Sequence, residues 1–234
     1  MQNYQLLDNA LLNSAGLNRQ AVFNLDALPQ EITAPVAAGC TSSRPYRQLI
    51  LIGHAGRTMW ESVTASGIKS DNPIDDFSTQ TVRQWFARCH PQNNYEIVYP
   101  GTQVIGLQKL GLLAGWHHAS PFMVGIDRDW GTWYAYRALV VADTDFAPTI
   151  PARSAHPCDS CEHKICITSC PARAMDQGQF DLGKCVGYRK QEGSRCKTTC
   201  LARVSCPIGS EHRYCDAQIH HTYLGSMRAI ERYY

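Results

Sequence analysis

Cysteines are the side chains of this sequence with the most evident chemistry. Of the 11 cysteines in the 234 residues, all but Cys40 and Cys89 fall between Cys158 and Cys215. Their order is Cys158-x2-Cys161-x4-Cys166-x3-Cys170-Pro171, then Cys185, then Cys196-x3-Cys200-x5-Cys206-Pro207, with Cys215 left over. Thiolates are strong ligands for zinc and for iron–sulfur clusters, so this run predicts a metal-binding segment.

Three kinds of site compete for this run of cysteines. A disulfide framework suits small secreted chains, and nothing in the sequence indicates secretion. Structural zinc usually takes two Cys-x2-Cys pairs, whereas gaps of three and four residues and two Cys-Pro endings stand here. In bacterial-type ferredoxins the cysteine before a proline ligates the other of two clusters. The two Cys-Pro endings therefore favour a pair of iron–sulfur clusters.

The ferredoxin rule predicts two intercalated ligand sets. The first set is Cys158, Cys161, Cys166 and Cys206, and the second set is Cys170, Cys185, Cys196 and Cys200. The gaps differ from those of the standard run, so the type of each cluster stays open, and Cys185 and Cys215 could exchange roles. Cys40 and Cys89 are interpreted as small buried apolar side chains.

Helical and extended patterns alternate ahead of the cysteines. The predicted elements are a helix over residues 1–25 broken at Gly16, a buried strand at 48–52, a helix from 72 to 86, a strand at 95–99, a helix at 107–114, and a β-hairpin made of 122–126 and 132–141. Prolines 148, 151 and 157 mark a linker. These patterns predict an α+β fold: a sandwich domain over 1–150, then a small domain over 151–234.

Composition narrows the class of protein further. A hydrophobic content of 44% and a net charge of +2 predict a folded chain rather than a disordered one. No apolar run approaches the roughly 18 residues of a membrane span, and the first residues lack the pattern of a signal peptide. We therefore expect a soluble cytoplasmic protein without a membrane or nucleic-acid partner, because a nucleic-acid partner needs a concentrated basic face.

Two features outside the cysteine run are candidate site residues. His117 and His118 are adjacent, so on a helix end they point about 100° apart and at most one of them faces a given ion. Their alternative role is a solvated or capping pair. The loop from Gly125 to Tyr134 contains Trp130 and Trp133. Its alternative is an ordinary hairpin with a packed aromatic tip.

The order of these motifs resembles a known group of proteins. The segment 107–116, the tetrapeptide Gly131-Thr132-Trp133-Tyr134 and the cysteine run together resemble epoxyqueuosine reductases and reductive dehalogenases. In that group a nitroreductase-like domain binds cobalamin beside a ferredoxin-like domain with two [4Fe-4S] clusters. Residues 1–150 also resemble the cobalamin-processing (decyanating) chaperone. The resemblance implies a nitroreductase-like α/β sandwich followed by a small two-cluster ferredoxin-like domain.

Carried over by position, the resemblance implies a set of cobalamin contacts. They are Gln108, Gly125, Ile126, Trp130, Gly131, Trp133 and Tyr134. Two departures stand out. Epoxyqueuosine reductases have Gly-Leu-Gly-Trp-Ile-Gly-Lys and a preceding proton-donating aspartate, where this chain has Ala114-Gly115-Trp116-His117-His118 and Tyr99-Pro100-Gly101. The repeat extension that grips transfer RNA is also absent, so we do not expect a transfer RNA substrate.

The resemblance implies a cobalamin-dependent iron–sulfur reductase. An external low-potential donor would supply electrons, and either a small molecule or cobalt itself would be reduced. Two alternatives remain: a cobalamin carrier whose clusters keep cobalt reduced, and an electron-transfer protein that holds FMN in the sandwich. The candidate proton donors are Tyr99, His117, His118 and Asp127, and the sequence does not choose among them.

Overall fold

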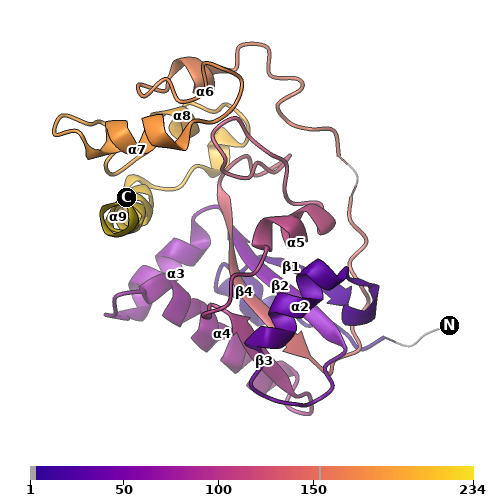
Figure 1. The fold of residues 1–234 in the computed structure, drawn as a ribbon. Coiled ribbons are helices and arrows are strands. Elements are labelled where there is room, and N and C mark those ends of the chain that lie inside the picture. Colours follow the sequence, from indigo (N-terminus) through magenta and orange to yellow (C-terminus); the bar gives the residue numbers. More distant parts are fainter. Residues whose placement is uncertain (1–3, 153) are drawn as a thin grey trace. The chain divides into compact units, whose positions relative to one another are not determined.

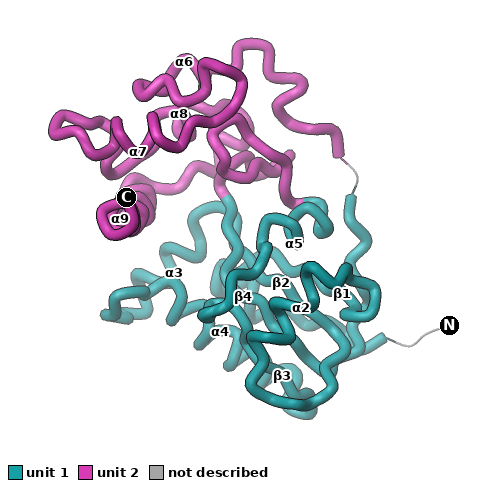
Figure 2. The backbone as a smooth tube through the Cα atoms, viewed as in Figure 1, with its two compact units in different colours: residues 1–115, 134–152 teal, residues 116–133, 153–234 magenta. Residues whose placement is uncertain are grey.

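The computed structural model describes residues 4–152 and 154–234. The chain divides into two compact units (Figure 2). Unit 1 comprises residues 1–115 and 134–152, and unit 2 comprises residues 116–133 and 153–234. Segment 116–133 thus belongs to the same unit as the cysteine run. Among the described residues, no helix combines the length and apolar character that crossing a membrane requires.

Unit 1 is a mixed α+β unit built on an antiparallel sheet of four strands in the order β1-β2-β4-β3 (Figure 1). Its strands are β1 (Arg19–Asn24), β2 (Gln48–Ala55), β3 (Tyr95–Tyr99) and β4 (Tyr134–Ala142). Its helices are α1 (Ala10–Ser14), the 3-10 helix η1 (Leu25–Ala27), α2 (Gln30–Gly39), α3 (Thr58–Ser66), α4 (Pro73–Cys89) and α5 (Leu107–Leu113).

β2 is a central strand whose middle, Leu49–Ile52, is apolar on both faces. Every residue of β2 is buried, and the strand pairs with β1 on one side and β4 on the other. Alternate side chains point to opposite faces, so Ile50 and Ile52 join the aliphatic core under α1, α3 and α4 while Leu49 and Leu51 face the other way. The predicted strand at 48–52 is therefore present and three residues longer.

α4 follows its predicted start closely. Pro73 occupies the first turn, where its missing N–H costs nothing, and the acidic Asp75 and Asp76 lie at the positive end of the helix dipole. Trp85 and Phe86 are buried in the core beside the sheet. The predicted elements at 95–99 and 107–114 are present as β3 and α5.

The helix predicted over residues 1–25 is mostly wrong, and residues 1–3 of that prediction lie outside the described part. Only α1 is helical, while residues 19–24 pair with β2 as strand β1. Gly16, with φ of 79°, turns the chain between them, and a Cβ there would lie 2.1 Å from the amide nitrogen of Met59. Long-range pairing with β2 thus overrides the local helical spacing.

The predicted hairpin is also wrong. β4 pairs with β2 and β3, not with residues 122–126. That segment makes only single bridges, His118 with Ile126 and Asp127 with Gly131. Its apolar side chains Phe122 and Ile126 are buried beside cysteines of unit 2. A short apolar run fits a strand and a buried loop equally well, which explains the error.

Unit 2 is made mostly of loops and short helices. Its elements are α6 (Ile165–Thr168), α7 (Leu182–Lys190), α8 (Leu201–Val204), the 3-10 helix η2 (Ser210–His212) and α9 (Asp216–Tyr233). Only α9 has the length and amphipathic pattern of an ordinary surface helix. α6 and α8 contact each other. α6 ends two residues before Cys170-Pro171, and α8 ends two residues before Cys206-Pro207.

Candidate metal centres

The eight cysteines of the two predicted sets line two separate cavities in unit 2. One cavity is lined by Cys158, Cys161, Cys166 and Cys206, together with Phe122 and Ile126. The other is lined by Cys170, Cys185, Cys196 and Cys200, together with apolar side chains such as Phe180 and Val186. The structure thus brings together the members of each predicted set. Their role as ligands stays a prediction.

Short helices place these thiols. α6 lies between Cys161 and Cys170, and α8 lies between Cys200 and Cys206. Cys166 lies on α6 and lines the first cavity, whereas Cys170, two residues after α6, lines the second. Cys200 and Cys206, on the two sides of α8, likewise line different cavities. Cys185 enters the second set from α7. One-turn helices therefore produce the crossing of the two sets.

The remaining cysteines lie elsewhere. Cys215 occupies the N-cap position of α9 and lines neither cavity. The Cys40 thiol donates to the carbonyl of Val36 at 3.3 Å, and Cys89 packs against the core of unit 1. None of the eleven cysteines forms a disulfide.

The thiols are costly to ionise without a metal. Burial raises the pKa of Cys158 to about 11, and the neighbouring Cys206, Cys166 and Cys161 add to the effect by repulsion. Burial likewise raises the pKa of Cys185 to about 11, with repulsion from Cys200 next. Four thiolates in one apolar cavity need a compensating positive charge, which an iron–sulfur core supplies. The donor set therefore fits a cluster in each cavity.

The four thiols of each set line a cavity and do not converge on the position of a single ion. Among the described residues, no three His, Cys, Asp or Glu side chains converge as the ligands of one ion do. A cubane cluster binds its thiolates at separate corners, so four sulfurs around a cavity suit it. The second cavity has a volume of about 270 Å³ and mainly apolar walls, which exclude water.

The residues predicted to contact cobalamin are distributed over both units. Gln108 on α5 is exposed, and Tyr134, the first residue of β4, is 6% exposed; both belong to unit 1. In unit 2, Ile126 and Trp133 are fully buried. Ile126 and Trp133 are therefore core residues, whereas Gln108 has an accessible polar group.

The loop containing Trp130 to Trp133 is anchored within unit 2. Trp133 packs on Tyr214, with ring centroids 5.3 Å apart, and the guanidinium of Arg203 lies 4.7 Å above the indole. Arg203 also donates to the carbonyl of Thr132 at 2.5 Å. In the described part of the chain the indole Nε1–H of Trp133 has no hydrogen-bond partner. One predicted cobalamin residue thus holds an unused donor.

Two glycines let this loop approach the segment that follows Cys206. Gly131 has φ of 57°, and a Cβ there would lie 1.9 Å from the carbonyl oxygen of Ile208. Gly209, with φ of 62°, faces it in the same way, because its Cβ would lie 2.4 Å from the amide nitrogen of Gly131. The predicted cobalamin loop therefore packs backbone to backbone on the chain leaving the first cysteine set.

Among the candidate proton donors of unit 2, Asp127 has a structural role. Its Oδ1 accepts hydrogen bonds from the N–H groups of Asp129 and Trp130 at 2.9 and 3.0 Å, which closes the turn. The ring centroids of Trp130 and His212 lie 4.2 Å apart.

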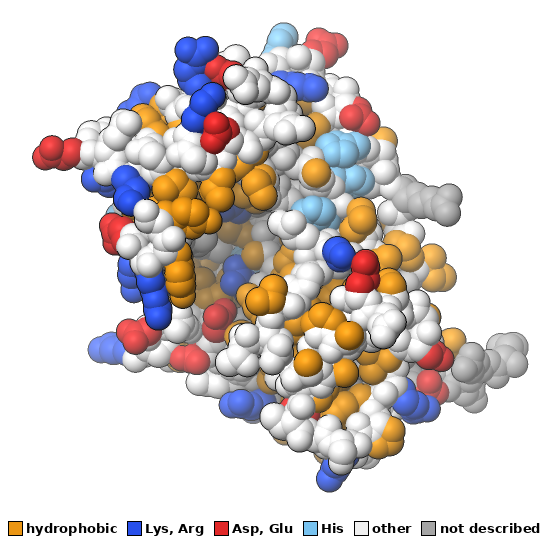
Figure 3. Space-filling model, in the orientation of Figure 1, with side chains coloured by type: hydrophobic (Ala, Val, Ile, Leu, Met, Phe, Trp, Pro, Cys, Tyr) orange, Lys and Arg blue, Asp and Glu red, His pale blue; other side chains and the backbone are white. Residues whose placement is uncertain are grey.

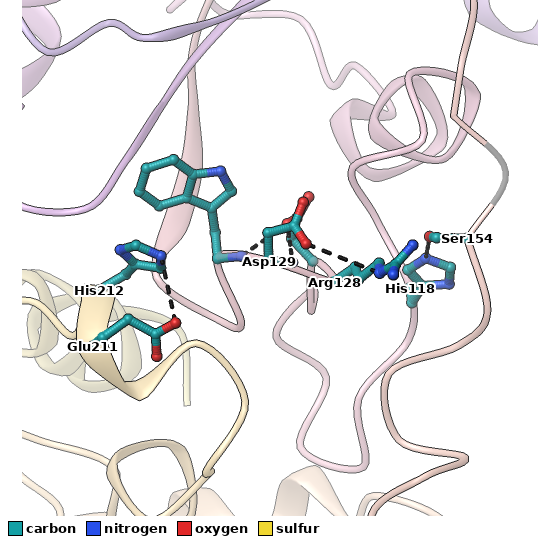
Figure 4. Close-up of polar contacts among 8 residues, drawn as sticks. His118, Arg128, Asp129, Ser154, Glu211 and His212 are labelled. Atoms are coloured by element: carbon teal, nitrogen blue, oxygen red, sulfur yellow. Dashed lines mark hydrogen bonds and ion pairs between the residues drawn. The ribbon is translucent and has the colours of Figure 1, made fainter.

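The histidine candidates lie in a partly buried group. His118 Nε2 is 3.1 Å from Ser154 Oγ (Figure 4). Burial lowers the pKa of His118, and repulsion from His156 lowers it further. Burial also lowers the pKa of His117, with His118 adding to the effect. Both rings therefore favour the neutral form.

The fourth candidate, Tyr99, belongs to a group of titratable side chains in unit 1. Arg137 Nε on β4 donates to Nδ1 of the buried His54 at 2.9 Å. Burial raises the pKa of Tyr99, and Arg137 opposes the rise. Burial also raises the pKa of Asp75 at the start of α4, and Arg137 again opposes the rise. Four elements thus bring an acid, a base, a phenol and a guanidinium together.

Sequence reasoning missed Arg189, Tyr223 and the Arg137 group. Arg189 lies four residues after Cys185 on α7, so helical spacing alone would have placed it on the cysteine face. The Arg137 group has no such local signal, because its members come from four separate elements. Over the face seen in Figure 3, basic and acidic side chains alternate without forming one large field of either sign.

Comparison with known proteins gives a fold but no family. No family model matches the chain, and no curated protein matches it in sequence. The solved structure of epoxyqueuosine reductase with an epoxyqueuosine-modified tRNA-Tyr stem loop matches with a TM-score of 0.55 at 13% identity, over 89% of this chain and 66% of that one. The enzyme from Bacillus subtilis gives 0.54 at 12% identity, over 88% and 66%.

A reductive dehalogenase structure also matches. It is described as suggesting a mechanism for B12-dependent dehalogenation, and the TM-score is 0.53 at 12% identity, over 92% of this chain and 33% of that one. The chain thus spans just under two thirds of the first reductase chain and about one third of the dehalogenase. At these identities the matches establish a shared fold.

Proposed function

We propose that this chain is a cobalamin-dependent iron–sulfur reductase. The observation that carries the proposal is the assembly of eight cysteines into two sets of four around separate cavities. The fold shared with epoxyqueuosine reductase and with a B12-dependent dehalogenase supports the cobalamin part. The substrate is either a small organic molecule or cobalt itself.

The two cysteine sets would each hold one [4Fe-4S] cluster, and an external low-potential donor would supply single electrons. The apolar walls of both cavities exclude water and lower the local dielectric, which are two of the factors that set a cluster's potential. Hydrogen bonds and nearby charges are the others. The chain's own contribution is to fix the sulfurs and the groups around them.

Cobalamin, once reduced, supplies the bond-breaking chemistry that no side chain can. Gln108 would hold it through an exposed amide, and Trp130 through a half-buried ring. The other predicted contacts, at Gly125, Ile126 and Gly131, would be made by backbone. Trp133 and Tyr134, the remaining predicted contacts, are both buried.

We assign the proton donor to Tyr99. Its hydroxyl retains its proton at neutral pH, because burial raises its pKa above the ordinary value. Arg137 stabilises the phenolate that remains after transfer, because its positive charge lowers the pKa of Tyr99 against the effect of burial. His54 holds the Arg137 side chain in place through Nδ1.

Anaerobic purification followed by iron, sulfide and cobalt analysis tests this proposal. We expect about eight iron atoms per chain for two [4Fe-4S] clusters, and a spectral change on adding cobalamin but none on adding FMN. Several reduced product molecules per chain would establish an enzyme. A single round of cobalt reduction would establish a carrier, tight FMN binding would establish a flavin protein, and zinc in place of iron would end the proposal.

The Tyr99 assignment has its own test. Tyr99→Phe removes the transferable proton and keeps the ring, so turnover should fall by about 10²-fold or more, while iron content and cobalamin binding stay unchanged. Tyr95→Phe on the same strand is the matched control, since its ring stacks on Phe86 in the core. Equal turnover of the two variants would contradict the assignment.

A further inference from the structure

Arg189 is a buried cation whose hydrogen bonds all go to neutral groups. Its side chain is 6% exposed. Nε donates to the carbonyl of Cys196 at 3.0 Å, Nη1 to Ser226 Oγ at 2.9 Å, and Nη2 to the carbonyls of Lys197 and Tyr223 at 3.3 and 3.2 Å. None of the ion pairs within residues 4–152 and 154–234 includes it. Its positive charge is therefore not neutralised by a carboxylate.

This charge lies beside the second cysteine set. Arg189 and Cys185 are one turn apart on α7, and Arg189 Nε bonds the backbone of Cys196. Arg189 lines the cavity of the second set together with both of these cysteines. Two of the four sulfurs of this set therefore experience the positive charge of Arg189 in a dry environment.

Tyr223 on α9 strengthens the same side of the site. Its ring lies 5.5 Å from the Arg189 guanidinium, and its carbonyl accepts from Nη2. Its hydroxyl is within hydrogen-bonding reach of the Cys200 sulfur. A hydroxyl that donates to a ligand sulfur favours the more negative, reduced state of a cluster.

The first cysteine set has a different electrostatic environment. The cation that acts on Cys158 is Lys164, whose side chain is exposed and therefore screened by water and salt. Among the described residues, Arg189 is the arginine that lines the second cavity, and no arginine lines the first.

We propose that Arg189, assisted by Tyr223, gives the cluster of the second set a higher reduction potential than the cluster of the first set. A cluster bound by four thiolates is an anion that gains one more negative charge on reduction, and a buried cation stabilises that added charge most. One electron would leave the first cluster and enter the second, with no bond made or broken. This inference rests on the iron–sulfur part of the proposed function and is independent of cobalamin.

A redox titration followed by electron paramagnetic resonance tests the inference on the full chain. The signals of the two clusters are assigned with Cys161→Ser and Cys185→Ser, each of which removes one ligand. At the potential where the second cluster of the unmodified chain is half reduced, Arg189→Gln should lower its ratio of reduced to oxidised form about tenfold, a shift of about 59 mV. The first cluster should titrate as before.

Two variants serve as controls. Arg189→Lys keeps a positive charge and should restore most of the lost reduction. Lys190→Gln removes an exposed charge from the same helix, where water screens it, and should leave both clusters unchanged. Where Arg189→Gln holds less iron, Tyr223→Phe provides the second measurement, with a smaller shift in the same direction.

The outcomes separate this inference from the proposed function. Wild-type protein without iron ends the proposed function and the inference with it. Two intact clusters whose second member titrates the same in Arg189→Gln and in Tyr223→Phe overturn only the role of Arg189. Equal shifts of both clusters, or a shift in Lys190→Gln as large as that in Arg189→Gln, do so as well.

Discussion

Among the described residues, unit 1 has a core cluster of fifteen buried side chains, whereas the clusters of unit 2 contain three or four buried residues each. One of these small clusters includes Cys166 itself, with Cys170 and Cys200 packed against it. Short segments with little apolar burial need an additional constraint to stay folded. If the proposed clusters are bound, metal stabilises unit 2, whereas apolar packing stabilises unit 1.

Removing iron should have the largest effect and should separate the two units most clearly. After anaerobic chelation, α6 and α8 should lose protection from hydrogen exchange, because metal binding and local folding are coupled in such sites. β2 and β4 should keep their protection, since they lie within the aliphatic core. Equal protection of α6 with and without iron would show that unit 2 folds by packing alone.

Single cysteine replacements come next. Cys170→Ala removes a thiol that lines the cavity of the second set, so about half of the bound iron and sulfide should be lost. The matched control is Cys215→Ala at the N-cap of α9, which should keep the full complement. Loss of iron from Cys215→Ala would instead show that Cys215 replaces Cys185 as a ligand.

A cavity in the core of unit 1 should act on stability and leave the metal unchanged. Ile52 is fully buried in the aliphatic core. Ile52→Ala should lower the free energy of unfolding by about 2–5 kcal/mol, and Ile52→Val by about 0.5–1.5 kcal/mol. Urea unfolding measures both, and iron analysis provides the control. An iron content that falls with the stability of unit 1 would break the separation between the units.

Glycine replacements should give a smaller and local effect in unit 2. Gly131→Ala puts an L side chain in the left-handed conformation, which costs about 1–2 kcal/mol, and it forces the backbone away from Ile208. Gly225→Ala on α9 meets nothing within 4 Å and should stabilise the helix by about 0.5–1 kcal/mol. In thermal unfolding, the midpoint of unit 2 should fall in Gly131→Ala and rise in Gly225→Ala. A Gly131→Ala protein as stable as the unmodified one would contradict the close approach.

Acid should have the smallest effect, and it should act on unit 1. Burial raises the pKa of Asp143, but hydrogen bonds from Asn94 and Asn93 outweigh it, so the folded pKa is lowered. Because the unfolded chain binds this proton more readily, the stabilisation is complete above about pH 4 and is lost as the pH falls through the folded value. Asp143→Asn should flatten this part of the stability curve. An unchanged curve would exclude Asp143 as its source.

Sequence reasoning was accurate where a feature depends on nearby residues. The buried strand predicted at 48–52 and the helix that starts at Pro73 follow from local apolar spacing and capping. The grouping of cysteines into cavities follows the Cys-Pro endings, because one-turn helices separate adjacent thiols. The helix predicted over residues 19–24 and the hairpin strand predicted at 122–126 were wrong, because long-range partners decided the conformation of both segments.

The sequence by itself determined the mixed α+β character, the central strand and the cysteines available as ligands, since these depend on composition and short spacings. Tertiary structure alone decided that Arg189 is buried beside thiols and that Arg137 joins His54, Asp75 and Tyr99. The physical reason is that burial and charge environment depend on residues distant in the chain. Their effects on a charged group are set by the fold that surrounds it.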